Sequence, residues 1–251
     1  MQSIISMLQR TVVLLTGLLI LKVTVATVWG YRSYFPPDFE ADFLLGREPY
    51  FFGSYRWAFY VHLASGPVSL LLGMLLISRR FRMRFPDRHR ILGRIQAANV
   101  LLLVVPSGVW LACFASAGAI AGVSFGLLAV FTGTCVVFGW RSAVSRQFAD
   151  HQRWMSRCFL LLCSAVVIRV IGGLATILGV DAPWFNPVAS WVSWLVPLAV
   201  FELTRPRHRR SGRPQATPDP PRWRTLLHQG SSPAMEIAAR RSAAGTSAKR
   251  G

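Results

Sequence analysis

The sequence predicts an all-α fold, a polytopic membrane helix bundle with six transmembrane helices and both termini in the cytoplasm. The first observation is composition: of 251 residues, 53% are hydrophobic and only 15% are charged, whereas about a quarter are charged in ordinary soluble domains. The second is a set of six apolar stretches, each close to the roughly 20 residues that cross a hydrocarbon core. The third is a regular alternation of basic and non-basic loops between these stretches.

The six expected spans form one transmembrane domain over residues 1–203. Arg10 precedes the first apolar stretch, as in a secretory signal, but the stretch is long, contains Lys22 and lacks a clear cleavage site. We therefore expect it to be retained as a helix. The spans are expected near residues 11–30, 57–77, 92–114, 120–140, 158–180 and 185–203.

The loops indicate the orientation of the chain. Residues 79–90, RRFRMRFPDRHR, carry six arginines and one acid, and the 141–157 connection carries four arginines against one acid. The 31–56 loop instead has four acids against three arginines, and the turns at 115–119 and 181–184 have no basic residue. Because basic loops stay in the cytoplasm, this alternation predicts cytoplasmic termini.

Residues 204–251 are predicted to form a disordered, basic cytoplasmic tail, because they combine eleven Lys or Arg with six prolines and little periodicity. The stretch 222–229, RWRTLLHQ, is alternatively a short helix lying on anionic lipid. The net charge of +18 falls in loops and tail rather than on one docking face. We therefore expect the lipid bilayer and anionic lipid headgroups as partners, and no specific nucleic acid.

Two ionisable residues are expected at membrane depth, where such groups cost several kcal/mol and indicate function by default. At about 1.5 Å per residue, His62 lies about 8 Å below the outer edge of the second span, and Arg169 lies about 16 Å below the outer end of the fifth. An arginine side chain reaches several Å along a helix. The two groups are therefore expected either to hold one anionic or carbonyl-bearing ligand together, or to satisfy neighbouring helices separately.

A second polar cluster is expected at the cytoplasmic membrane surface. Its members at the start of the third helix are His89, Arg90 and Arg94, and those at the start of the fifth helix are His151, Trp154 and Arg157. Helix N-termini favour anions, because free N–H groups and the helix dipole point there. The cluster is thus either an anion-binding mouth or a set of interfacial side chains that contact lipid phosphate. Glu202, at the end of the sixth span, is expected to pair with one of these arginines.

Three segments together resemble the membrane-protein family known as domain of unknown function 2306: YVHLASGPVSLLLGMLLISRRFR, HRILGR and DHQRWMSRCFLLLCSAVVIR. The resemblance covers roughly residues 56–203, and its specificity lies in the combined spacing. Gln96 departs from the family pattern, which has an aromatic residue soon after Arg94. The resemblance implies the membrane fold and candidate residues, and it implies no reaction. The matching positions are His62, Gly66, Gly73, His89, Arg90, Gly93, Arg94, His151, Trp154, Met155, Arg157 and Arg169.

Three functions are compatible with these residues. The favoured hypothesis is a protein that binds or transports a small anionic or amphipathic molecule in a pocket lined by histidine and arginine. The second is a membrane oxidoreductase linked to b-type haem or quinone, with His89 and His151 as the haem ligands. The third is a structural or assembly protein. Four cysteines in apolar runs without a CxxC pair offer no metal site, and an arginine-rich chain with two lysines favours a bacterial plasma (inner) membrane.

Overall fold

The computed structural model describes residues 2–41 and 43–204, and these are helical with no strand. The all-α prediction is confirmed. The predicted tail lies outside the described residues except for Thr204, which ends the last helix. The elements in chain order are α1 (Gln2–Gly30), η1 (Tyr31–Ser33), α2 (Glu48–Tyr50), η2 (Phe51–Tyr55), α3 (Arg56–Ile77), α4 (Arg79–Arg84), α5 (Pro86–Asn99), η3 (Val100–Val104), α6 (Val105–Ala112), α7 (Ala119–Val144), α8 (Phe148–Leu162), α9 (Ser164–Leu178) and α10 (Phe185–Thr204).

Six helical segments of the described chain are long and apolar enough to cross a membrane, which confirms the six predicted spans. The second, third and fifth begin earlier than predicted, because polar turns ahead of the apolar stretch are also helical. Asp150, for example, lies in the first turn of α8, where a carboxylate is favoured by the helix dipole. The segments are Thr11–Ser33, Glu48–Ile77, Pro86–Ala112, Ala119–Val144, Phe148–Leu178 and Phe185–Thr204.

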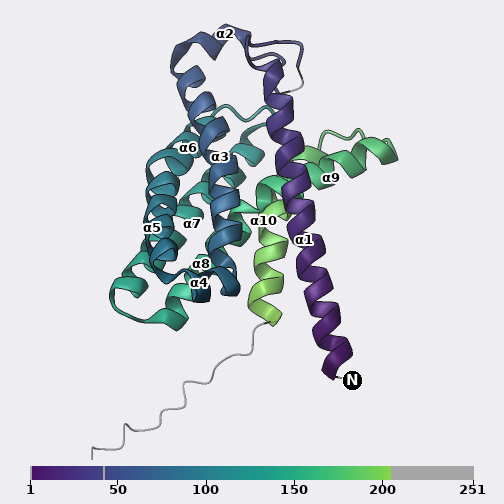
Figure 1. Ribbon diagram of the computed structural model, residues 1–251. Coiled ribbons are helices and arrows are strands. Elements are labelled where there is room, and N and C mark those ends of the chain that lie inside the picture. Colours follow the sequence, from purple (N-terminus) through teal and green to yellow (C-terminus); the bar gives the residue numbers. More distant parts are fainter. Residues whose placement is uncertain (1, 42, 205–251) are drawn as a thin grey trace, which may run out of the picture. The chain divides into compact units, whose positions relative to one another are not determined.

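The helices α3, α5–α6, α7, α8 and α10 pack side by side (Figure 1). We call the end of this bundle that carries residues 31–41, 43–55 and 113–118 the α2 end, and the end that carries residues 78–85 and 145–147 the α4 end. Helix α1 begins at the α4 end and reaches the α2 end, in contact with α3 and α9. The predicted cytoplasmic side corresponds to the α4 end, and its orientation in a membrane stays a prediction.

Small residues let α6 and α7 approach closely. A Cβ atom added to Gly122 would lie 2.7 Å from the backbone oxygen of Ala112, and one added to Gly133 would lie 3.3 Å from Val105. Close contact through small residues drives helix association in lipid, where the hydrophobic effect between helices is weak. The buried cluster beside this contact joins η3, α7, α8 and α10 through Val100, Cys135, Val136, Cys158, Leu161 and Trp194.

The fifth span is broken rather than continuous. Helix α8 ends at Leu162, Cys163 forms a turn, and α9 continues in a new direction, away from the bundle and past α1 (Figure 1). Helix α9 keeps contact with α10 and α1, yet its far half is open: Leu174 is 54% exposed and Ile177 is 82% exposed. The break therefore places the residues of α9, Arg169 among them, beside α1 instead of inside the bundle.

Candidate functional site

His62 lies on α3 and faces α6. Its Nδ1 atom lies 3.0 Å from the hydroxyl oxygen of Ser107, and that hydroxyl itself lies 2.5 Å from the carbonyl oxygen of Leu103. A serine hydroxyl has one proton, which it donates to this carbonyl, so the hydrogen bond from His62 must come from a protonated Nδ1. In the neutral imidazole, the Nε2 atom then carries the lone pair.

Arg169 lies in the first half of α9, and its side chain is exposed. Its Nη1 atom donates to the backbone oxygen of Ala165, one turn earlier, at 2.7 Å. The guanidinium is close enough to the imidazole of His62 and to the hydroxyl of Tyr31 for their charges to interact. The structure thus brings the predicted pair His62 and Arg169 into electrostatic range, and it adds Tyr31, which the sequence did not single out.

A groove of about 560 Å³ lies beside Arg169, between α1 and α9. Its other walls are apolar or nearly so. Thr27 contributes a hydroxyl, but that hydroxyl is bonded to the carbonyl of Val23 in its own helix at 2.8 Å. Arg169 is therefore the one charged residue of the lining described here, which consists of Val23, Ala26, Thr27, Arg169, Val170, Gly173, Leu174 and Ile177.

At the α4 end, the structure brings the two predicted histidines near each other. The Nδ1 atom of His151 donates to the carbonyl oxygen of Gly139 on α7 at 2.8 Å. In the neutral imidazole the Nε2 atom then carries the lone pair. The Nδ1 atom of His89 is buried and has no partner among the described residues. The two imidazoles, with Arg82 of α4, are close enough for their charges to interact. Haem ligation by this pair stays a prediction.

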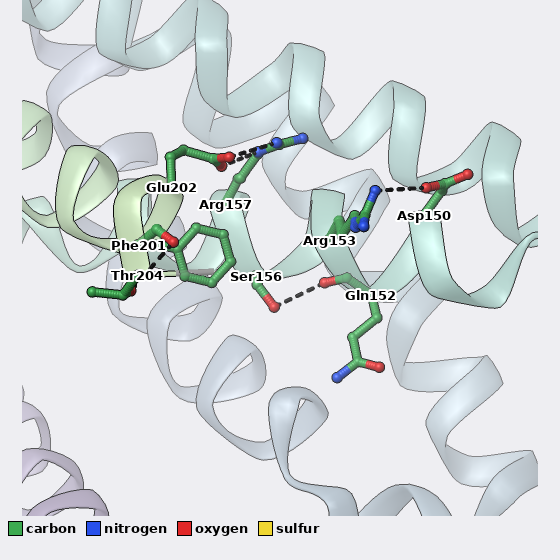
Figure 2. Close-up of polar contacts among 8 residues, drawn as sticks. All are labelled: Asp150, Gln152, Arg153, Ser156, Arg157, Phe201, Glu202 and Thr204. Atoms are coloured by element: carbon green, nitrogen blue, oxygen red, sulfur yellow. Dashed lines mark hydrogen bonds and ion pairs between the residues drawn. The ribbon is translucent and has the colours of Figure 1, made fainter. Parts of the chain in front are cut away.

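The predicted arginines of the cytoplasmic cluster lie in three different settings. Arg90 and Arg94 are exposed, and Arg90 makes a 3.4 Å ion pair with Asp87 in its own helix. Arg157 instead pairs with Glu202 across α8 and α10, as expected, with 2.6 Å between Nε and Oε1 (Figure 2). Any anion at this end would therefore share Arg157 with a carboxylate.

Trp154 packs between α7 and Arg157. Its ring stacks on Phe138 of α7 at 5.0 Å, and the guanidinium of Arg157 lies 4.6 Å from its centre. Because α8 begins at Phe148, His151, Trp154 and Arg157 all belong to one helix. Trp154 thus joins α7 to α8 and orients Arg157 toward Glu202.

Sequence reasoning missed Arg47, the buried arginine of the α2 end. It is 5% exposed. Its guanidinium donates to the hydroxyl of Tyr55 at 2.6 Å, to the carbonyl of Phe114 at 3.1 Å and to the hydroxyl of Ser116 at 3.2 Å, and it lies 4.4 Å from the ring centre of Phe43. The density of aromatic residues between positions 31 and 60 was the available signal, since aromatic rings commonly cover a buried guanidinium.

Sequence reasoning also did not predict which groups the side-chain amides of α5 bind. Gln96 is buried and donates to the carbonyl of Ser69 at 3.0 Å, and Asn99 donates to the hydroxyl of Ser69 at 2.7 Å. Both bonds cross from the third span to α3. Within residues 2–41 and 43–204, no group of three or more His, Cys, Asp or Glu side chains is arranged to hold a metal ion.

A family model described as "Predicted membrane protein (DUF2306)" matches residues 59–205. The chain belongs to this family. The DUF2306 segment includes His62, His89, His151 and Arg169, so the candidate residues of α3, α5, α8 and α9 all lie within it, whereas α1 and Arg47 lie before it. Comparison with curated proteins and with solved structures finds no similar chain. The DUF2306 description names a membrane protein and no activity.

Proposed function

We propose that this DUF2306 protein binds an amphipathic anion, a lipid or lipid-like acid, in the groove between α1 and α9. The observation that carries the proposal is Arg169. It is a cation in a membrane-spanning segment that bonds only a carbonyl of its own helix and forms no ion pair with any acid among the described residues. A charge at such a position is costly unless something pairs with it, and an anionic headgroup would supply the missing partner.

The rest of the groove suits an apolar chain. Its volume of about 560 Å³ falls within the roughly 300–1,000 Å³ typical of ligand pockets. Valine, leucine and isoleucine side chains line it on both helices. Because Leu174 and Ile177 are largely exposed, a ligand would enter sideways from the bilayer. Tyr31 and His62 offer a hydroxyl and an imidazole within electrostatic range of the same guanidinium.

We place this activity in the bacterial plasma membrane, which the arginine-rich composition supports. Nothing in the described geometry favours the haem–quinone or purely structural alternatives over it. A neighbouring hollow on α1 provides a useful comparison. Lys22 lies there among Leu18, Leu21, Val25, Ala26 and Trp29, so it is a membrane-span cation on one helix surface with no facing helix to enclose a chain.

The test is native mass spectrometry of the full chain released from detergent, titrated separately with phosphatidylglycerol, oleate and phosphatidylcholine. We expect Arg169→Leu to weaken retention of phosphatidylglycerol or oleate about ten- to hundredfold, since a hydrogen bond to a charged group contributes about 1.5–3 kcal/mol. Phosphatidylcholine should bind the wild type and Arg169→Leu equally. If Arg169→Leu weakens the binding of phosphatidylglycerol, the groove binds a phosphate headgroup, and if it weakens the binding of oleate, the groove binds a carboxylate.

Two matched controls sharpen the result. Gly173→Leu adds a side chain inside the groove and should reduce binding, whereas Gly172→Leu adds the same side chain at a neighbouring position outside the lining. Lys22→Leu removes a span cation that is not part of the groove's lining and should leave binding unchanged. If Arg169→Leu retains both anions as well as Lys22→Leu does, the proposal is wrong.

A further inference from the structure

One face of α3 carries a polar stripe. His62, Ser65 and Ser69 follow each other at spacings of three and four, which places them on one side of the helix. Ser65 is 3% exposed and Ser69 is fully buried. The stripe therefore faces the bundle interior, where it meets the third span.

The third span presents a matching stripe because of its π turn. His89, Gln96 and Asn99 lie at spacings of seven and three, on one side of α5. Ser107 comes eight residues after Asn99, which in an unbroken α-helix would rotate it about 80° away. The π turn η3 accommodates one extra residue and so returns Ser107 to within about 20° of the same side. The contact between Ser107 and His62 at 3.0 Å agrees with this register.

Hydrogen bonds join the two stripes but leave polar atoms unpaired. Asn99 donates to the carbonyl of Ser65 at 3.1 Å and to the hydroxyl of Ser69, and Gln96 donates to the carbonyl of Ser69. The hydroxyl oxygen of Ser65, the Oε1 atom of Gln96 and the Nδ1 atom of His89 are buried and have no partner among the described residues. Buried polar atoms are normally satisfied by protein or by ordered water, so these three atoms indicate water between the stripes.

The stripes extend over most of a bilayer. His62 and Ser69 are seven residues apart, as are His89 and Gln96, and seven residues rise about 10 Å. Because Gln96 bonds the carbonyl of Ser69, the segment from His62 to Ser69 on α3 is followed in depth by the segment from Gln96 to His89 on α5. Together the two segments cover about 20 Å of a hydrocarbon core of about 30 Å. A histidine stands at each end, with His151 near His89. Gly93, one turn from His89, has no neighbour within 4 Å of its added Cβ, which leaves room there.

We propose that these stripes hold a file of water that conducts protons across the membrane domain, between His62 at the α2 end and the His89–His151 pair at the α4 end. A proton that arrives at the Nε2 atom of His62 passes from water to water beside Ser65 and Gln96 and leaves through the imidazoles at the far end. At His62 the proton adds to Nε2 and then leaves from the same atom to the next water, so one N–H bond forms and breaks again and the Nδ1–H tautomer is restored. Each step between waters breaks one O–H bond and forms another. The driving force is the membrane potential or the pH difference.

This inference goes beyond the proposed lipid site. It rests on the interface of α3 with α5 and α6, whereas the lipid site rests on the groove between α1 and α9. The two proposals are tested with different variants and different measurements, so one can be refuted while the other stands. His62 is the one residue in both arguments, and it is not mutated in either test.

The experiment uses the full chain in liposomes that contain the pH dye pyranine, with a potassium gradient and valinomycin to set the membrane potential. The wild type is expected to acidify or alkalinise the lumen faster than protein-free liposomes. Gln96→Leu and Ser65→Ala each remove an unpaired water acceptor and are expected to slow the proton flux at least tenfold. Ser190→Ala is the matched control, because Ser190 is buried on α10 and bonds the carbonyl of Pro187 in its own helix at 2.6 Å.

Gel filtration and thermal unfolding of each variant show whether it folds, and Ser65→Ala is the mildest change because it deletes a single oxygen. A wild-type flux equal to that of protein-free liposomes overturns the proposal. So does a flux through folded Ser65→Ala and Gln96→Leu that equals the flux through Ser190→Ala. Loss of flux in both stripe variants, with Ser190→Ala at the wild-type rate, supports it.

Discussion

Arg157 on α8 and Glu202 on α10 form a two-point ion pair, with Nε–Oε1 at 2.6 Å and Nη2–Oε2 at 3.0 Å (Figure 2). The paired geometry is the one that arginine forms best with a carboxylate. It links the last span to the bundle at the α4 end. The side chains are 25% and 42% exposed, so solvent weakens the attraction.

We therefore predict a modest coupling between these two residues. A double-mutant cycle with Arg157→Ala and Glu202→Ala should give a coupling free energy of about 0.5–1 kcal/mol in a mixed-micelle denaturant titration. The control is the Arg153–Asp150 pair, which is 3.6 Å long and lies within one helix turn (Figure 2); its coupling should stay below about 0.5 kcal/mol. Equal couplings for the two pairs would contradict the special role of the two-point geometry.

Arg47 is predicted to be the charged residue whose loss most destabilises the α2 end. Arg47→Leu removes three donors from buried or half-buried acceptors and should cost about 2–4 kcal/mol. Arg47→Lys should fall between this variant and the wild type, because lysine lacks the planar fork. Arg32→Leu is the control, since Arg32 is exposed and makes a single ring contact with Trp29 at 4.3 Å. Thermal unfolding of the full chain provides the comparison, and equal losses for positions 47 and 32 would refute the prediction.

Two glycines one turn apart on α7 should respond in opposite ways to alanine. Gly122→Ala would place a methyl group 2.7 Å from the backbone oxygen of Ala112, which cannot move without shifting the end of α6. Gly126→Ala makes only an ordinary contact at 3.9 Å and gains up to about 1 kcal/mol of helix propensity. We expect a lower melting temperature for the first variant and an unchanged or higher one for the second. A higher melting temperature for both would mean that α6 and α7 do not pack as described.

The orientation of the chain can be tested with its own cysteines. Cys113 is exposed at the α2 end, whereas the other three cysteines are buried. If that end faces away from the cytoplasm, a membrane-impermeant maleimide should label intact spheroplasts, and Cys113→Ser should abolish the labelling. Adding Ser145→Cys at the α4 end of the Cys113→Ser variant should restore labelling only after permeabilisation. Labelling of Ser145→Cys in intact spheroplasts would reverse the predicted topology.

Much of the fold could be predicted from sequence, because a bilayer imposes both span length and internal backbone bonding. Depth counting left two possibilities for His62 and Arg169, a shared ligand or separate contacts with neighbouring helices. The count treated the fifth span as one straight helix, whereas the turn at Cys163 carries Arg169 sideways to α1. No proline or glycine precedes this turn within α8, so the sequence held no strong signal for it.

The register of the third span could not be predicted for a related reason. Residues Val100–Val104 read as a uniform apolar run, and periodicity alone does not distinguish an α turn from a π turn. The hydrogen-bond partners of Arg47 also could not be predicted from sequence, since they depend on how two loops meet. In both cases the deciding contact joins residues far apart along the chain, which local patterns do not encode.

The bonds of Arg47 have a consequence for biosynthesis. Its acceptors Phe114 and Ser116 come 67 and 69 residues later in the chain, which at about 5–20 residues per second is several seconds of translation. Until the third span has emerged, the guanidinium has only Tyr55 and the nearby rings to hold it. During that interval the loop, residues 31–41 and 43–55, has its contacts with α3, such as the hydrogen bond from Tyr60 to the carbonyl of Tyr34 at 3.0 Å, but lacks its bonds to residues 114 and 116. We expect protease to cut this loop faster in a nascent chain arrested before position 114 than in the released protein.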